Sequence, residues 1–273
     1  MNELIIEPGR AEKNYWRDLW RFRELFYFLA WRDILVRYKQ TVIGIAWAVL
    51  RPFLTVIVFT VVFSRIAKIP APSSIPYALL VMAAMLPWQF FATSLSEASN
   101  SLIDNSSLIS KIYFPRLIIP AGSVITAFVD FLITLVLMSL LMLWYSFFPD
   151  WKLSLLPIFM ILAFACSFGM GLWLCALNVE YRDFRYLVPF IVQFGLYISP
   201  VGFTSNIVPE KWQMFYSLNP MVGVIEGFRW CLLRGEVPLR LSAITVSASV
   251  TGILCLSGIC FFRKMERTFA DVI

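Results

Sequence analysis

The stretch LIIPAGSVITAFVDFLITLVLMSLLMLWYSFFP, residues 117–149, holds 33 residues and a single charged side chain, Asp130. A helix needs about 20 apolar residues to cross the hydrocarbon core of a bilayer. The run is long enough to span, and its apolar residues are continuous, unlike the alternation of a barrel strand. This stretch therefore predicts a membrane-spanning helix and places the chain among integral membrane proteins.

Six further apolar stretches flank this one, and five of them are also about as long as a span. Residues 212–225 are too few to span and lie between helix breakers, which predicts a short buried or re-entrant piece. Hydrophobic residues make up 60% of the chain, against about 45–50% in soluble domains. We predict an all-α integral membrane protein with a cytoplasmic tail and interface helix at 1–40 and a six-span transmembrane domain at 41–273. The spans are expected at about 41–64, 77–95, 117–149, 153–179, 186–208 and 241–262.

The distribution of Lys and Arg predicts the orientation. With six spans both tails lie on one side, and both tails are basic. Placing them in the cytoplasm puts 15 of the 23 Lys and Arg residues inside and seven outside, as the positive-inside rule requires. The net charge of +6 is then explained by anionic lipids of the inner leaflet, and nucleic acid is not an expected partner.

Several kinds of chemistry are excluded by residues that the sequence lacks. The chain has no histidine and no G-x-x-x-x-G-K-[ST] motif, so a histidine base or metal ligand and a nucleotide-binding P-loop are absent. No cluster of carboxylates falls in an apolar stretch, and no metal or cofactor is expected in this chain. Asp130 is interpreted as a protonated or hydrogen-bonded residue at a helix contact, with a functional role as the alternative.

The inner end of the first span is preceded by an amphipathic segment and by basic residues. Residues 15–29 place aromatic and leucine side chains on one helical face and charges opposite, which suits a helix in the membrane interface or one packed on a soluble partner. Arg37 and Lys39 are explained by anchoring at the inner face. Arg51 follows an apolar run, so it either snorkels to the interface or meets an anionic group.

The cytoplasmic link at 96–116 predicts a docking element. Ser106 and Ser107 suit the N-cap of a short helix over 108–114, which Pro115 ends. Apolar residues on a helix outside the bilayer predict docking, either into a partner subunit or back onto the spans.

The outer segment 204–240 and several deep aromatic residues suggest a pathway. One short helix is expected from Pro209 to before Asn219, and another from about Met221 to Leu233. The pair either re-enters the membrane as a lid or lies on its surface. Aromatic rings inside spans can stack on sugar faces, although packing against lipid or the core is the alternative. These aromatic residues are Trp88, Phe90, Phe91, Trp173 and Tyr197.

Five segments together resemble the membrane-spanning subunit of polysaccharide-export ABC transporters of the O-antigen, capsule and teichoic-acid type. They are WRDILVRYKQTVIGIAW (31–47), SLISKIYFPRLIIP (107–120), ALNVEYRDFRYLVP (176–189), SLNPM (217–221) and ERTFADVI (266–273). The resemblance implies a homodimer of six-span subunits with a separate ATPase dimer, which binds ATP and Mg²⁺. It implies a coupling helix against the ATPase in 108–116, with Leu108, Ile109, Lys111, Ile112, Tyr113, Phe114 and Arg116. It also implies a periplasmic gate in 209–233, with Trp212, Phe215, Tyr216, Asn219, Pro220, Glu226 and Arg229.

The resemblance predicts the permease subunit of an ATP-driven exporter of a lipid-linked bacterial polysaccharide across the inner membrane. The polymer is expected to thread a channel between two copies, with Arg37, Lys39 and Arg51 receiving the lipid-pyrophosphate end. The chain itself is not expected to be an enzyme. The alternatives are a membrane-embedded acyl- or glycosyltransferase, for which no catalytic set is visible, and an ion-coupled carrier, for which Asp130 is the sole mid-span charge.

Overall fold

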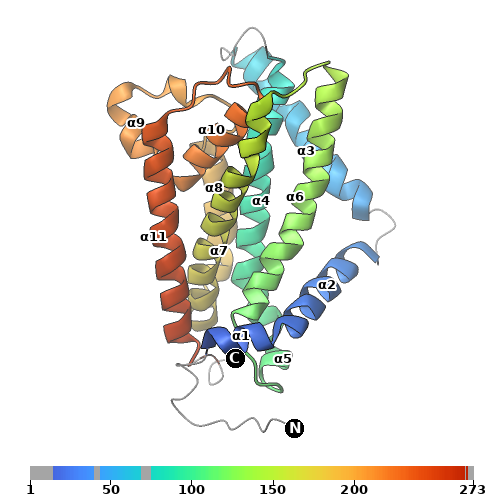
Figure 1. Ribbon diagram of the computed structural model, residues 1–273, viewed down its shortest axis with the longest axis vertical. Helices are drawn as coiled ribbons and strands as arrows, with labels where there is room; N and C mark the ends of the chain where they lie inside the picture. Colours follow the sequence, from blue (N-terminus) through green and yellow to red (C-terminus); the bar gives the residue numbers. More distant parts are fainter. Residues whose placement is uncertain (1–14, 40–43, 69–74, 268, 270–273) are drawn as a thin grey trace.

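A computed structural model describes residues 15–39, 44–68, 75–267 and 269 as a single helical bundle (Figure 1). In this part of the chain all regular structure is helical. The elements are α1 (Tyr15–Arg21), α2 (Arg23–Lys39), α3 (Gly44–Phe59), η2 (Thr60–Ile66), α4 (Tyr77–Asp104), α5 (Ser106–Ile109), α6 (Ile118–Trp144), η3 (Trp151–Leu155), α7 (Leu156–Glu180), α8 (Phe184–Ile198), η4 (Ser205–Ile207), α9 (Glu210–Tyr216), α10 (Pro220–Leu232) and α11 (Leu241–Met265).

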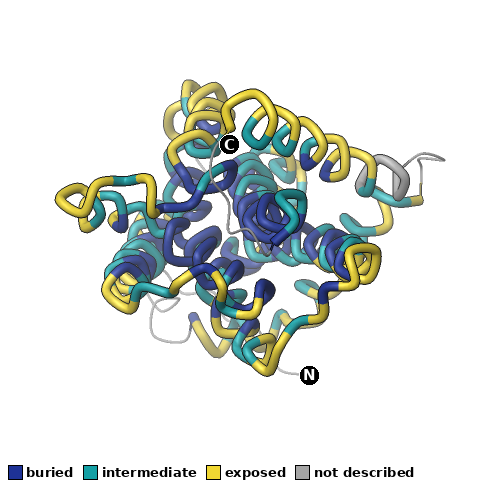
Figure 2. Tube along the Cα trace, turned by 90° about the horizontal axis from the view of Figure 1, so that it is seen from above, coloured by how far each residue is buried: buried dark blue, intermediate teal, exposed yellow. Residues whose placement is uncertain are grey.

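Helix α4 forms the centre of the bundle. In its most apolar 18-residue segment 78% of the residues are buried, whereas the corresponding values for the other four long helices are 11–44%. Seen from above, a dark core of buried residues is surrounded by helices whose outer faces are exposed (Figure 2). Since the exposed faces are apolar, as in Leu140 and Ile161, they suit a lipid environment or a second copy rather than water.

Five helical segments are long and apolar enough to cross a membrane: 49–66, 77–104, 118–144, 151–180 and 241–265. The expected fifth span at 186–208 does not have the predicted length. Helix α8 ends at Ile198, and Ser199 adopts an extended backbone before Pro200. Proline disfavours the helical conformation at the residue before it, which explains why α8 ends at Ile198. At about 22 Å for 15 residues, α8 is shorter than a bilayer core of about 30 Å.

Several other boundaries also differ from those predicted. The second span continues past Leu95 to Asp104, and the third ends at Trp144 rather than at Pro149. The first span closes with a π-helix, Thr60–Ile66, which the hydrophobic pattern does not signal. Its expected start at residues 41–43 lies outside the described residues, as do residues 1–14 and 40 of the expected N-terminal region.

The amphipathic region before the first span forms two helices, α1 and α2, instead of one. Helix α2 is inclined and packs along α6, with its C-terminal end well above the base of the bundle (Figure 1). Whether either helix lies in the membrane interface stays a prediction.

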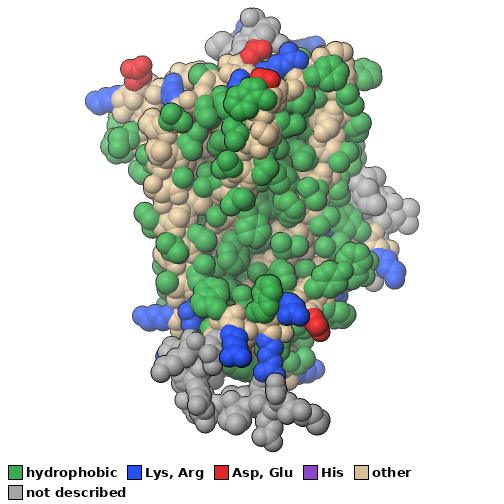
Figure 3. Space-filling view, in the orientation of Figure 1, with side chains coloured by type: hydrophobic (Ala, Val, Ile, Leu, Met, Phe, Trp, Pro, Cys, Tyr) green, Lys and Arg blue, Asp and Glu red, His purple; other side chains and the backbone are tan. Residues whose placement is uncertain are grey.

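The charges are concentrated at the ends of the bundle. Apolar side chains cover the middle of the visible face, and Lys and Arg gather at the end from which the tails emerge (Figure 3). Helices α7 and α11 meet very closely between these ends. A Cβ added at Gly258 would lie 2.4 Å from the carbonyl oxygen of Gly169, so a larger residue there would force the two helices apart.

Candidate functional site

Three side chains from different elements form a charged cluster beside the C-terminal end of α2. The Arg37 guanidinium lies 2.5 Å from a Glu97 carboxylate oxygen and 2.8 Å from an Asp130 carboxylate oxygen. The Tyr38 hydroxyl donates a hydrogen bond to Asp130 as well. All three charged side chains are about one-fifth to one-third exposed. The cluster thus joins α2 to α4 and α6 through partly dehydrated ion pairs.

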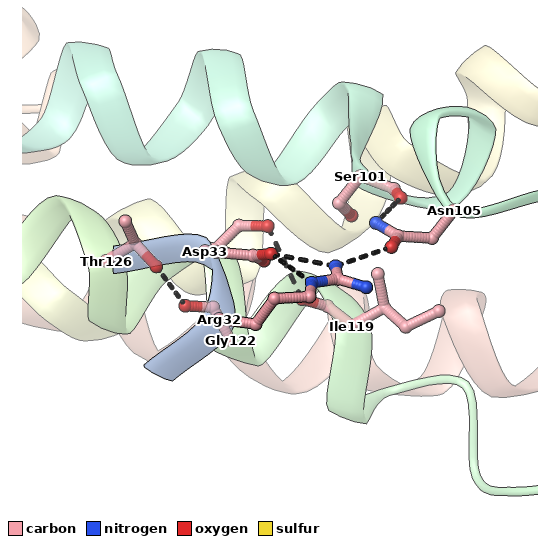
Figure 4. Close-up of polar contacts among 8 residues, drawn as sticks. Arg32, Asp33, Ser101, Asn105, Ile119, Gly122 and Thr126 are labelled. Carbon is pink, nitrogen blue, oxygen red and sulfur yellow. Dashed lines mark hydrogen bonds and ion pairs between the residues drawn. The ribbon is translucent and has the colours of Figure 1, made fainter. Parts of the chain in front are cut away.

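A second polar contact fixes α2 nearer to the tail end of the bundle. Figure 4 shows the Arg32 guanidinium between Asp33 and Asn105. Its Nη2 donates to the Asn105 side-chain oxygen at 2.9 Å, and the Asn105 amide donates to the Ser101 carbonyl oxygen at 2.9 Å. Asn105 directly follows α4, so Arg32 connects α2 to the base of that helix. Two polar anchors about one and a half turns apart hold the inclined helix in place.

These contacts change how Asp130 and the expected entry residues are understood. Asp130 is hydrogen-bonded at a helix contact, which agrees with the simpler interpretation of the sequence. Two carboxylates form ion pairs with Arg37. They therefore weaken the attraction of its guanidinium for a phosphate. Lys39, the last residue of α2, is exposed, and so is Arg51 on α3. Binding of a lipid pyrophosphate by these three residues stays a prediction.

Replacing Arg37 with Gln is expected to loosen α2 from the bundle. The substitution leaves Glu97 and Asp130 as neighbouring carboxylates without their shared cation, at a cost of about 1 kcal/mol after solvent screening. Amide hydrogen exchange across 23–39 should become faster in the variant. The matched control is Lys39→Gln at the exposed end of the same helix. Equal exchange in Arg37→Gln and the parent would show that the cluster does not hold α2.

The link between α4 and α6 forms an exposed apolar loop rather than the predicted helix over 108–114. The helical turn covers only Ser106–Ile109, and the chain is non-helical from Ile112 to Pro115. Pro115 disfavours a helical conformation at Phe114, which explains why that residue is not helical, but the turn ends earlier, at Ile109. Ile109 and Phe114 are buried and anchor the loop, whereas Ile112 and Tyr113 are 51% and 53% exposed. The loop therefore presents two large apolar side chains at the tail end of the bundle.

The C-terminal end of α11 is bound to this loop. The Arg116 backbone N–H donates to a Glu266 carboxylate oxygen at 2.7 Å, and its Nη1 donates to the Glu266 carbonyl oxygen at 2.6 Å. Arg263 lies over the Tyr15 ring at 4.6 Å, which brings α1 to the same place. Burial raises the pKa of Glu266 above its ordinary value, while the contacts with Arg116 act in the opposite direction. The loop is thereby joined to both terminal regions.

The outer segment forms the two expected short helices, and they differ in burial. On α9, Trp212 and Phe215 are 55% and 65% exposed, and the Tyr216 hydroxyl donates to the Ile198 carbonyl oxygen at 2.8 Å. Helix α10 starts at Pro220, and the Asn219 side chain caps it by accepting from the Met221 N–H at 3.0 Å. Almost all of α10 is buried against α4, α7 and α11. Helix α10 is therefore packed into the bundle instead of lying on its surface, and the gate role of the pair stays a prediction.

The buried charges of α10 hold the non-helical backbone that follows α8. The Arg229 side chain is fully buried and donates to three carbonyl oxygens, those of Leu80 at 3.1 Å, Val201 at 2.8 Å and Phe203 at 2.7 Å. Glu226, one helical turn earlier, accepts a hydrogen bond from Ser205. Backbone without helical hydrogen bonds needs other partners when it is buried, and Arg229 supplies them here.

The five aromatic residues predicted to line a channel do not share one surface of this chain. Trp88, Phe90 and Phe91 are buried in the core on α4. Trp173 stacks on Phe261 with ring centroids 4.1 Å apart. Tyr197 is 63% exposed on α8. A channel role for this set stays a prediction.

Sequence reasoning missed Glu97, Arg32, Asn105 and Glu266 as participants in these sites. Glu97 sits in a polar run after an apolar stretch, which the hydrophobic pattern assigns to a loop. A helical wheel continued through that run would have placed it on α4. The partners of Arg32 and Arg116 are distant in sequence and carry no local signal.

The fold and these two ends define a class of protein. Five long apolar helices, an exposed apolar loop at one end and the buried helix α10 at the other are what a multi-pass membrane protein would present. The chain belongs to the ABC-2 type transporter family, whose signature matches residues 24–233. It is accordingly a transport subunit that works with an ATPase partner, and it is not itself an enzyme.

Curated relatives match nearly the whole chain. The O-antigen export system permease protein RfbA of Klebsiella pneumoniae is 28% identical, covering 89% of this chain and 92% of the relative. The protein of the same name from Myxococcus xanthus is 25% identical, covering 94% of this chain and 98% of the relative. The polysialic acid transport protein KpsM of Escherichia coli is 22% identical, covering 86% of this chain and 91% of the relative.

Proposed function

We propose that the chain is the permease subunit of an ATP-driven exporter that moves a lipid-linked bacterial polysaccharide, such as an O-antigen, across the inner membrane. The observation that carries the proposal is the end-to-end similarity to permeases named for O-antigen and polysialic acid transport. Similarity confined to the apolar helices would indicate only a membrane protein. The match also includes the exposed apolar loop between α4 and α6 and the short helices α9 and α10, which fall within residues 24–233.

The working unit in this proposal is a homodimer, with both termini in the cytoplasm. The central helix α4 is largely buried by its own protomer, so a polymer finds no path along the axis of one copy. A channel between two copies resolves this, and the apolar outer face of α8 offers contact surface for it. ATP and Mg²⁺ belong to the partner ATPase, and this chain needs no cofactor of its own.

The alternatives have less support. A membrane-embedded acyl- or glycosyltransferase would need a catalytic base or a metal-binding carboxylate pair near a membrane face. The carboxylates that come together in the described residues, Glu97 and Asp130, share the cation Arg37 between them. An ion-coupled carrier would need a carboxylate that exchanges its ion, whereas Asp130 is bound by Arg37 and Tyr38. Membership of the ABC-2 type family favours coupling to an ATPase instead.

Deletion of the gene tests the proposal. The native host without this permease should still make the lipid-linked polymer but keep it on the cytoplasmic side. In intact spheroplasts the polymer should be inaccessible to an added antibody or glycosidase, and lysis should expose it. Restoring the parent gene should return the polymer to the outer surface. Normal surface polymer in the deletion strain would overturn the proposed function.

Arg51 offers a test of substrate entry. If its exposed guanidinium meets the pyrophosphate of the lipid carrier, Arg51→Gln should lower the ATPase activity that added substrate stimulates. Arg51→Lys should restore part of it, because Lys keeps the charge without the bidentate geometry. Basal ATPase activity of the reconstituted complex is the internal control. Full stimulation in both variants at equal expression would show that Arg51 only reaches the membrane interface.

A further inference from the structure

An apolar groove opens on the side of the bundle, in the half that lies away from the chain termini. Its volume is about 610 Å³, and α3, η2, α4 and α6 line it. Phe53, Ile57 and Val61 form one wall, Leu140 and Trp144 belong to the other, and Met82 of α4 lies at its base. The wall residues are 40–84% exposed, whereas Met82 is buried. The groove is thus open sideways, toward the region that the membrane occupies.

The length of the groove matches one leaflet of a bilayer. Along the first wall it runs from Phe53 to Arg65, which is at most about 18 Å at the rise of an α-helix. Half of a bilayer core is about 15 Å. The groove starts near the middle of α3 and ends beside Trp144 and Tyr145 at the outer end of α6. Aromatic residues at this level are typical of the membrane–water interface.

One cation stands at the outer end of this apolar surface. Arg65 is the single charged side chain among the residues that line the groove. It is exposed, and it has no ion pair or hydrogen bond with another residue of the described ranges. It belongs to the π-helix Thr60–Ile66, which also contributes Thr60 and Val61 to the groove. π-Helical turns inside helices occur often at functional sites.

We propose that this groove is a binding site for an anionic phospholipid of the outer leaflet. The acyl chain lies along Phe53, Ile57 and Leu140, and the phosphate contacts Arg65. A chain of one leaflet's length fits an 18 Å apolar surface better than a transmembrane partner helix, which would continue through the inner half. The site rests on the proposed orientation, with both termini in the cytoplasm, but it does not depend on the transported polymer.

The charge of Arg65 also argues against a second copy as the occupant. Two copies related by an axis along the membrane normal place equivalent residues at the same depth. Contact between their grooves would bring the two Arg65 side chains together, and no acidic residue lines the groove to offset the repulsion. The phosphate of a bound lipid would instead attract Arg65.

Photolabelling tests the proposal on the full chain in phosphatidylcholine vesicles. Trace phosphatidylglycerol with a diazirine in its acyl chain is compared with the matching phosphatidylcholine probe, and labelled peptides are mapped by mass spectrometry. Peptides covering 53–65 and 137–145 should take up about fivefold more of the anionic probe, the value of one cation at a membrane surface. Arg65→Gln should abolish this preference, while Lys68→Gln, an exposed cation outside the groove lining, should retain it.

A groove-filling variant separates this site from general lipid contact. Leu140→Trp should lower labelling of both peptides by either probe. Leu143→Trp, on the same helix, similarly exposed but outside the groove lining, should leave labelling unchanged. Equal labelling by the two probes in the parent would overturn the proposal in favour of non-specific lipid. Protection from both probes, with a cross-link between two copies at these helices, would overturn it in favour of a dimer contact.

Discussion

Replacing Ile112 and Tyr113 together with Asp is expected to abolish co-purification of the partner ATPase and to stop export, while the permease remains inserted. Each of these side chains is about half exposed. Burying a large apolar side chain in a partner is worth about 1.5–3 kcal/mol. Loss of two such contacts, with the added cost of placing carboxylates in an apolar groove, should weaken association by more than about 100-fold. The measurement is the amount of ATPase retained by tagged permease in detergent.

Two variants control for damage to the permease itself. Ser110→Asp adds a negative charge at an exposed position of the same loop and should retain the ATPase. Ile112→Leu with Tyr113→Phe keeps the apolar surface and should also retain it. Unchanged thermal unfolding would show that the double Asp variant is folded. Retention of ATPase at the parent level by that variant would show that the partner docks elsewhere.

If the ATPase binds this loop, as predicted, the connections of the loop indicate how its movement would reach the bundle. Ile109 and Phe114 anchor the loop in the core beside α6. Arg116 binds the end of α11 through Glu266, and α11 packs along α7 and α10. A displacement of the loop therefore acts on α6 and α11 together. Helix α11 then connects the loop at one end of the molecule to the buried helix α10 at the other.

The hydrophobic pattern predicts the class and most of the helices because membrane spans depend on local composition. The runs at 77–95 and 153–179 lie inside the helices found, and the two short outer helices begin and end close to the predicted residues. Where the prediction was wrong, a backbone effect competes with hydrophobicity. Helix α8 ends before Pro200 within a run that remains uncharged to Pro209, and the helical turn that precedes Pro115 ends at Ile109.

The polar contacts were harder to predict because their partners are far apart in the chain. Arg37 and Glu97 are 60 residues apart, and Arg116 and Glu266 are 150 residues apart. A single sequence shows that Arg37 and Asp130 are charged near apolar segments, but it does not show that α2 inclines along α6. The apolar groove at Arg65 has the same origin, because it arises only when α3, α4 and α6 are packed together.

Arg229, a residue of the predicted gate, forms its hydrogen bonds with backbone carbonyl oxygens. The family resemblance implies that it belongs to a periplasmic gate, and it is fully buried in α10. Its guanidinium satisfies carbonyl oxygens of residues 201 and 203, in the non-helical segment between α8 and α9, and one at the start of α4. A cation at this place is retained only if its hydrogen bonds offset the cost of removing it from water. Arg229 therefore holds α10 against the start of α4 and against the backbone that follows α8.

Replacing Arg229 with Met is expected to lower the free energy of unfolding by about 3 kcal/mol or more, since up to three buried acceptors lose a donor at about 1–3 kcal/mol each. Hydrogen exchange should become faster in 199–204 and in α10, and the thermal midpoint in detergent should fall. Arg229→Lys keeps the charge but not the planar fork, so its loss should be intermediate. The control is Arg240→Gln, whose side chain makes an exposed bond to Asn206 and should change stability by less than about 0.5 kcal/mol. Equal midpoints for Arg229→Met and the parent would show that these hydrogen bonds do not hold α10 in place.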